Sequence, residues 1–310
     1  MTKLMGQTEH RIAKILCLGQ AVQDFVFSVD ALPDAGEKYR AHAFETVGGG
    51  PAATAAVTIA KLNGHAQLIA RLGDDQIGDL ILNELTGYGV DCELVRRFAG
   101  QRSSLSAVML DKAGERMIVN YLDPELPQNT DWLPEIKADA VLADTRWVGG
   151  SKAILSSAKA AGLPAILDAD RPVPKGAELI SCASHVAFSA EGLSDWAGDD
   201  DHRQNLKEAA RQSGAWCCVT LGGDGVLFTT SDGIQHMPAF KVDVVDSLGA
   251  GDVWHGAFAL CLGEGGDEED ALRFANATAA LKVGRKGGRR GTPTRLEVED
   301  YLAAHPPQGE

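Results

Sequence analysis

One short segment combines residue types that can hold an anion and accept a proton. In Gly249-Ala250-Gly251-Asp252, which opens a helical run, two glycines let backbone N–H groups point into one space at a helix N-terminus. The helix dipole favours anions there, so the segment predicts an anion hole. The Asp252 carboxylate, in the first helical turn, is placed to accept a proton beside it. Helix starts also enrich glycine and aspartate for structural reasons alone.

The surrounding pattern predicts an α/β fold. Ile12–Gly19 is an apolar strand ending in glycine, and from Pro51 onward apolar strands alternate with helical patterns at intervals of about 25–35 residues. Pro51 suits the first position of a helix that ends at Asn63-Gly64. The alternation indicates βαβ units on a parallel sheet. In the last third we expect helices near Gly251–Leu262, Glu268–Val283 and Leu296–Ala303.

Two stretches break this rhythm. Polar and apolar residues alternate with a period of two in Phe25–Val47 and in Ser103–Tyr121, which is typical of strands with one face in water. The second stretch folds back at Lys112-Ala113-Gly114. We expect the two to pair as a small β-sheet that projects from the main domain as a lid. The predicted organisation is a core of residues 12–24, 48–102 and 122–305, and a lid of residues 25–47 and 103–121.

Composition narrows the class of protein. The 310 residues include 29 Lys and Arg against 43 Asp and Glu, which gives a net charge of −14. Such a chain repels nucleic acids and anionic membranes, so we expect neither as a partner, and an anionic ligand needs a local basic pocket. No apolar run reaches the roughly 18 residues of a membrane helix. Without an apolar signal segment at the N-terminus, we expect a cytoplasmic protein. Its six cysteines should be reduced and mostly buried, with metal ligation the alternative.

The segment around the anion hole resembles a family signature. Asp246-Ser247-Leu248-Gly249-Ala250-Gly251-Asp252, followed by Val253-Trp254-His255-Gly256-Ala257, resembles the Asp-Thr-x-Gly-Ala-Gly-Asp signature of the ribokinase-like, or PfkB, carbohydrate kinases. Supporting matches cover almost the whole chain and include Asp24, Gly48–Gly50 and Val219-Thr220-Leu221-Gly222 with Gly225. The resemblance implies a Rossmann-like α/β core flanked by helices, with a β-sheet lid. It also implies transfer of the γ-phosphoryl group of ATP, with Mg²⁺, to a sugar hydroxyl.

By position, the resemblance assigns roles to the matching residues. Asp252 is the catalytic base, and the anion hole is formed by Gly249, Ala250 and Gly251. Substrate-binding residues on the lid side are Asp24, Gly48, Gly49 and Gly50. The nucleotide site includes Thr220, Gly222 and Gly225. Asp246 is expected to help bind a monovalent cation such as K⁺, and exposed lid edges that pair between subunits imply a homodimer.

The chain departs from the family pattern in two places. The lid glycines are often followed by an Ala-Asn pair, whereas Ala52-Ala53-Thr54 has no asparagine. The Asn-x-x-Glu element that helps organise Mg²⁺ is replaced by Ser189-Ala190-Glu191-Gly192. Glu191 stands one position away and is the candidate Mg²⁺ carboxylate.

Four further segments resemble one group within the family, the 6-deoxy-6-sulfofructose kinases. They are Val47–Val57, Val119-Asn120-Tyr121, Leu142–Trp147 and Pro238–Asp246. In that group a Lys on the first lid segment, an Asn on the second and an Arg after a core strand meet the sulfonate. The matching residues are Lys38, Asn120 and Arg146. Arg and Lys suit a tetrahedral oxyanion that stays ionised. Taken singly, Lys38 fits a solvated surface lysine and Arg146 an ion pair with Asp144 or Asp168.

Other acceptors and other classes stay open. Fructose 6-phosphate or tagatose 6-phosphate suits the same cations, 2-keto-3-deoxygluconate could use Arg146 alone, and fructose, ribose or a nucleoside needs no cation. Gly48-x-Gly50-x-x-Ala53, with Arg71, also fits the NAD(P) fingerprint of a dehydrogenase, but Tyr39–Val47 lacks the buried parallel strand which that motif requires. A noncatalytic sugar-binding protein would not need Asp252 beside an anion hole.

Overall fold

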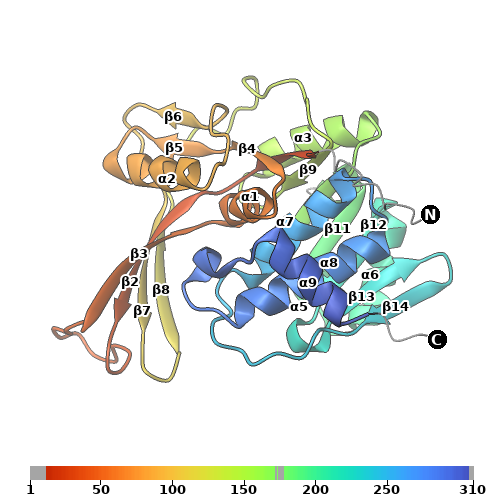
Figure 1. Ribbon diagram of the computed structural model, residues 1–310. Helices are drawn as coiled ribbons and strands as arrows, with labels where there is room; N and C mark the ends of the chain where they lie inside the picture. The colour runs from red at the N-terminus through yellow and green to blue at the C-terminus, as the bar shows by residue number, and fades with distance from the viewer. Residues whose placement is uncertain (1–11, 172, 174–177, 307–310) are drawn as a thin grey trace, which may run out of the picture.

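The computed structural model describes residues 12–171, 173 and 178–306. The main sheet consists of β1 (Lys14–Leu18), β4 (His65–Ile69), β9 (Ala140–Ala143), β10 (Ala165–Ala169), β11 (His185–Ser189), β12 (Trp216–Thr220), β13 (Val226–Thr230) and β14 (Gly233–Met237). Their order is β14-β13-β12-β11-β10-β9-β1-β4 (Figure 1). The strands from β12 to β4 pair in parallel, as expected, whereas β13 and β14 add an antiparallel edge.

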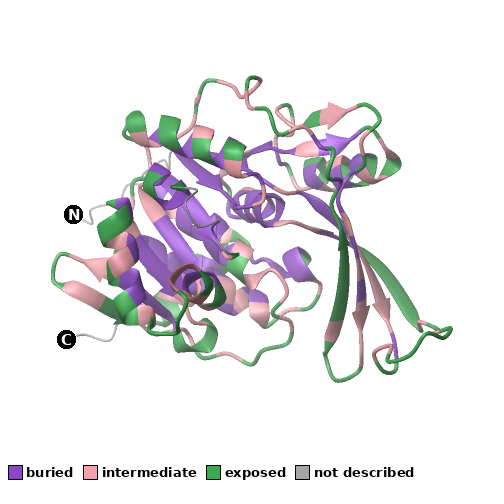
Figure 2. Cartoon of the chain, turned by 180° about the vertical axis from the view of Figure 1, so that it is seen from behind, coloured by how far each residue is buried: buried purple, intermediate pink, exposed green. Residues whose placement is uncertain are grey.

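Helices cover both faces of this sheet, and each face has its own apolar core. One face packs against α1 (Pro51–Lys61), α2 (Gln76–Gly87), α7 (Ala250–Gly263), α8 (Glu268–Val283) and α9 (Arg295–Ala304). The other packs against α3 (Val148–Ala160), α4 (Leu179–Cys182), α5 (Ala190–Ala197) and α6 (His202–Ser213). Figure 2 shows the sheet as buried between these layers. Burial on both faces explains the unbroken apolar run of β9.

A second sheet projects from this body as the expected lid (Figures 1 and 2). It consists of β2 (Val22–Ser28), β3 (Ala43–Gly49), β7 (Leu105–Leu110) and β8 (Arg116–Tyr121), in the order β3-β2-β7-β8. β2 and β7 pair in parallel, which joins the two lid stretches. Because the β2–β3 ladder runs from Ser28↔Ala43 to Val22↔Gly49, Asp24 and Gly48 lie in the lid sheet rather than in the core segments expected for them.

The outer strands of the lid, β3 and β8, leave one edge each without a neighbour within the sheet. Large apolar side chains are exposed on them, among them Phe44 at 54% and Val119 at 59%. Exposed edge strands favour pairing with another chain. The expected homodimer through the lid stays a prediction.

Several smaller features were not expected from the sequence. β5 (Arg71–Gly73) and β6 (Arg96–Phe98) form a two-stranded sheet, and η1 (Gly222–Asp224) and η2 (Gly288–Gly291) are short 3₁₀ turns. All six cysteines are free, and four of them are buried, in line with the expectation of reduced, apolar thiols. In the described part of the chain, no helix is long and apolar enough to cross a bilayer.

Candidate active site

The anion-hole segment lies where β14 leads into α7. Gly249 caps the helix with a φ of 71°, a left-handed conformation that glycine adopts without a steric cost. The Ala250 N–H donates to the Ser247 carbonyl at 3.1 Å, whereas the amides of the first helical turn have no partner within the helix. Apart from the neighbouring backbone of α7, no atom of the described residues lies within 4 Å of the position that a Cβ of Gly251 would take. An anion can therefore approach these amides closely.

Two cavities meet at this helix start. The smaller, of about 80 Å³, is lined by Asp24, Val47, Gly48, Gly49, Gly50, Thr54, Leu248, Gly249, Asp252, Gly288 and Arg289. The larger, of about 460 Å³, is lined in part by Thr220, Gly222, Gly225, Ala250 and Gly251. The predicted base thus faces the same cavity as Asp24 and the lid glycines, and the predicted nucleotide residues share the other. The helix start therefore borders both cavities. Ala250 and Gly251 line the larger one, and Gly249 and Asp252 line the smaller one.

The carboxylate of Asp252 is largely buried and has a raised pKa. Burial is the main cause that raises its pKa, to about 7, and the nearby carboxylates of Asp170 and Asp144 act in the same direction. The guanidinium groups of Arg146 and Arg289 oppose this shift. A proton acceptor works best when its pKa lies close to the working pH. Asp252 therefore has the position and the pKa of a general base.

Arg289 belongs to the smaller cavity and was missed in the sequence. Its side chain is 1% exposed, with Nη2 2.9 Å from Glu84 Oε2. Its Nε and Nη1 have no hydrogen-bond partner among the described residues. A Cβ at Gly48 would overlap the guanidinium, so a larger residue there would displace the Arg289 side chain. Buried donors of this kind are normally satisfied, which makes Arg289 a donor available to a ligand of the cavity.

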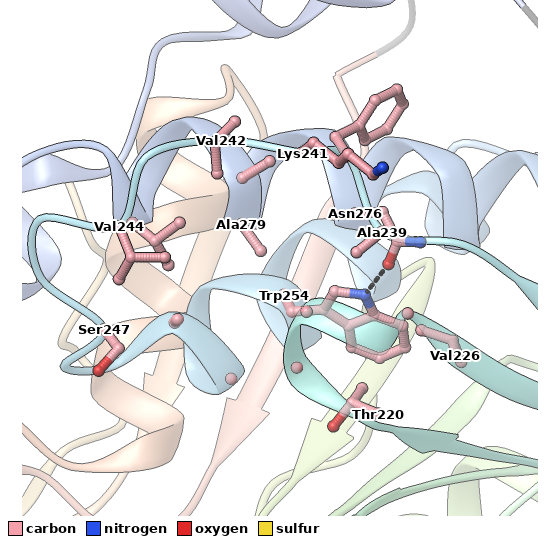
Figure 3. A pocket seen from close by; sticks show the side chains of 18 residues that line it. Thr220, Val226, Ala239, Lys241, Val242, Val244, Ser247, Trp254, Asn276 and Ala279 are labelled. Atoms are coloured by element: carbon pink, nitrogen blue, oxygen red, sulfur yellow. Dashed lines mark hydrogen bonds between the residues drawn. The ribbon is translucent and has the colours of Figure 1, made fainter.

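The larger cavity has the lining of a nucleotide site. Figure 3 shows Val226, Val244 and Ala279 around it, together with Thr220 at the end of β12. The Trp254 Nε1–H donates to Asn276 Oδ1 at 2.8 Å. Within the described residues, Asn276 Nδ2 has no partner and is a free donor at the cavity wall. A mostly apolar cavity with a few placed polar groups suits a flat heterocycle.

Comparison with known proteins decides the family. The chain matches the pfkB family of carbohydrate kinases over residues 12–295. It belongs to this family. It is 30% identical to the ribokinase of Bacillus subtilis over 296 residues, which cover 93% of this chain and 99% of that one.

Solved structures agree. An Agrobacterium tumefaciens protein is 34% identical, with a TM-score of 0.89 over 94% of this chain and 98% of that one. An Arabidopsis thaliana ribokinase solved with ribose and ATP is 28% identical, with a TM-score of 0.81 over 94% and 99%. The predicted fold, family and enzyme class are thus confirmed: the chain is a phosphotransferase with a sugar hydroxyl as acceptor. The dehydrogenase and the noncatalytic sugar-binding protein are not supported.

Arg146 of this pfkB kinase lies beside the base but outside the lining of the smaller cavity. It follows β9, and its Nη2 is 2.8 Å from Asp170 Oδ2. From Arg146, Asp144 accepts the backbone N–H at 2.8 Å and not the guanidinium. The ion-pair partner is therefore Asp170 rather than Asp144 or Asp168, because the chain leaves β10 after Ala169 and Asp170 turns toward Arg146. Arg146 acts on the pKa of Asp252 and is 23% exposed, so it is near the base and open to solvent.

The two lid residues expected at the sulfonate are placed differently. Asn120 is exposed on β8 and pairs with Ser106 of β7, which in turn pairs with Asp24 of β2. Directly paired residues point to the same face of a sheet, so Asn120 shares a face with Asp24. Lys38 is exposed in the loop between β2 and β3 and is not among the residues that line the smaller cavity. The structure thus places Asn120 on the same face of the lid as Asp24 and leaves Lys38 outside the cavity lining.

The candidate Mg²⁺ ligand, Glu191, is not among the residues that line the two cavities. Glu191 is exposed in the first turn of α5. Over the residues that the structure describes, no group of three His, Cys, Asp or Glu side chains is arranged to hold a metal ion. Small, hard cations such as Mg²⁺ are commonly held by substrate phosphates, waters and one or two carboxylates. The role of Glu191 as a Mg²⁺ ligand stays a prediction.

Proposed function

We propose that this pfkB kinase transfers the γ-phosphoryl group of ATP to the C1 hydroxyl of 6-deoxy-6-sulfofructose. One observation carries the proposal: the first turn of α7 borders both cavities, with Asp252 toward one and Gly251 toward the other. An acceptor hydroxyl in the smaller cavity meets the base at the same helix end that the phosphates reach from the larger one. A similar kinase solved with ribose and ATP supports ATP as the donor.

In this reaction the residues at the start of α7 have different roles. Asp252 takes the hydroxyl proton while the oxygen attacks the γ-phosphorus in line. The amides of Gly249–Gly251 face the charge that develops on the transferring group. In this proposal Glu191 would be the protein carboxylate for Mg²⁺, and the ion, bound with ATP, would supply charge neutralisation at the phosphates. Asp24, which lines the same cavity as Asp252, accepts hydrogen bonds from sugar hydroxyls.

The surroundings of the smaller cavity favour an anionic acceptor. In a chain of charge −14, an anionic sugar needs local cations. Arg146 lies beside the base, and Asn120 lies two strands from Asp24 on one face, roughly 10 Å away at the usual strand spacing. That separation suits a six-carbon sugar held at both ends. Lys38 lies outside the smaller cavity, so in this proposal it reaches the sulfonate only when the lid loop closes over the sugar.

Ribose is the second candidate acceptor. The Bacillus subtilis relative is a ribokinase, and the Arabidopsis relative was solved with ribose. A neutral pentose would need only hydrogen bonds from groups such as Asp24 and the lid glycines. It would leave Arg146 and Asn120 without a role in binding.

An ATP-consumption screen separates these acceptors. The panel is sulfofructose, fructose 6-phosphate, tagatose 6-phosphate, 2-keto-3-deoxygluconate, fructose, ribose and adenosine. We expect sulfofructose to give the highest kcat/KM and phosphorus NMR to place the new phosphate on C1. Two cations and a neutral amide suit a monoanion better than a phosphate, which carries about −1.5 to −2 at pH 7. If a neutral sugar or nucleoside reacts faster than every anion, the sulfonate assignment is wrong while the kinase assignment stands.

A further inference from the structure

The carboxylate of Asp246, expected to help bind a monovalent cation, is already surrounded by hydrogen-bond donors. Its Oδ1 accepts the Leu248 N–H at 2.9 Å and Arg116 Nη2 at 3.1 Å. Its Oδ2 accepts the N–H groups of Gly287 at 3.1 Å and Gly288 at 2.9 Å. Both oxygens are thus engaged by groups of positive or partly positive charge.

Lys282 of α8 completes this shell. Its side chain is 0% exposed, and its Nζ donates to the main-chain oxygen of Asp246 at 2.7 Å. The same Nζ lies 3.9 Å from Asp246 Oδ2. All three oxygens of Asp246 therefore face nitrogen donors. A buried lysine is rarely kept in a protein unless it is paired, and here Asp246 is its partner.

This donor set does not fit a K⁺ ion. Such an ion is held by oxygen lone pairs, as in rings of backbone carbonyls, whereas the lone pairs of Asp246 already accept N–H groups. An added cation on Asp246 would also stand next to the ammonium of Lys282 and the guanidinium of Arg116. Like charges at about 4 Å repel by several kcal/mol at the effective dielectric of a protein surface.

We propose that the Lys282 ammonium takes the place of the monovalent cation at Asp246, so that this kinase works without K⁺. Lys282 then holds the loop Asp246–Gly249, which leads directly into the anion hole, by a fixed charge in place of an exchangeable ion. It touches no reacting atom and is a positioning residue. Arg116 adds a second fixed charge from lid strand β8 and ties the lid to the same loop.

The pKa of Lys282 reflects its burial and the charged groups around it. Burial is the main cause that lowers its pKa, and Arg116 acts in the same direction. The carboxylates of Asp246 and Asp252 raise it. Both carboxylates thus favour the charged form of Lys282, which the proposed ion pair with Asp246 requires.

The wild-type enzyme gives the first test. Initial rates are measured in KCl, NaCl and choline chloride at one ionic strength, so that screening is equal, with substrates supplied as Tris salts. We expect rates within about twofold of each other in the three salts, because equal ionic strength leaves only specific ion effects. The thermal unfolding midpoint should likewise be the same in KCl and in choline chloride, since no K⁺ binds the folded state. Activation of about tenfold or more by K⁺ alone, or a K⁺-dependent midpoint, would overturn the proposal.

Two variants give the second test. Lys282→Met removes the charge and keeps most of the apolar stem, and should lose roughly 10–150-fold in kcat, the loss expected for a hydrogen bond to a charged group. Lys282→Ala opens space, so K⁺ or methylammonium should restore part of its rate whereas choline should not. Lys286→Met, which removes an exposed lysine nearby, is the matched control and should respond to no salt. Full activity of Lys282→Met, or a folded Lys282→Ala that no small cation rescues, would contradict the role of the ammonium.

Discussion

Asp252→Asn lowers kcat by about 10²–10⁴-fold, the usual loss for a general base, while ATP binding persists. The amide keeps the shape of the side chain in the first turn of α7 but cannot take the hydroxyl proton. Steady-state rates and calorimetric titration with ATP measure the two effects. Asp270→Asn, at the third position of neighbouring α8 and exposed, is the matched control and should keep the wild-type rate.

The pH profile sharpens this prediction. Because the pKa of Asp252 is raised to about 7, the carboxylate that accepts the proton forms only as pH rises through that value. Wild-type kcat should climb through pH 7 and level off above it, and Asp252→Asn should lack this rise. Near-normal turnover in the variant, or an unchanged rise with pH, would remove Asp252 from the role of base.

Arg146→Ala raises KM for sulfofructose by roughly 10–150-fold, which corresponds to the 1.5–3 kcal/mol of a hydrogen bond to a charged group. The KM for ATP should stay the same, because Arg146 is not among the residues that line the larger cavity. Lys38→Ala acts in the same direction but less, since this lysine is exposed and screened by water. Lys112→Ala, which removes an exposed lysine at the other lid turn, is the matched control for it.

Loss of Arg146 should also change the pKa of Asp252, and this change has to be separated from the effect on sulfofructose binding. Arg146 neutralises Asp170, and Asp170 raises the pKa of Asp252. The variant should therefore move the pH rise of kcat upward, so KM is compared on the plateau above it. If Arg146→Ala leaves KM for sulfofructose within about twofold of wild type there, the arginine does not hold the sulfonate.

The start of α7 and the parallel sheet could be predicted because their signals are local. A glycine pair before a helical run fixes the start of α7. The sequence predicts a helix near Glu268–Val283, and α8 spans these residues. The lid could be predicted as well, because strands with alternating polar residues between buried βα units have only each other to pair with.

The remaining site residues could not be predicted, because tertiary contacts define them. Arg289 reaches the cavity beside Gly48, and Lys282 meets Asp246 across 36 positions of sequence. The sequence offers Asp144 and Asp168 as partners of Arg146, whereas the fold pairs it with Asp170. Only the fold shows that Asp168 stays in β10 and lies 3.4 Å from His255, whereas Asp170 has left the strand.

The most direct measurement is a crystal structure of the kinase with sulfofructose and a nonhydrolysable ATP analogue. We expect the C1 oxygen within hydrogen-bond distance of Asp252, the γ-phosphate at the amides of Gly249–Gly251, and the sulfonate on Arg146 and Asn120. A sulfonate held by Arg289 instead, or a sugar whose C1 points away from Asp252, would contradict the account.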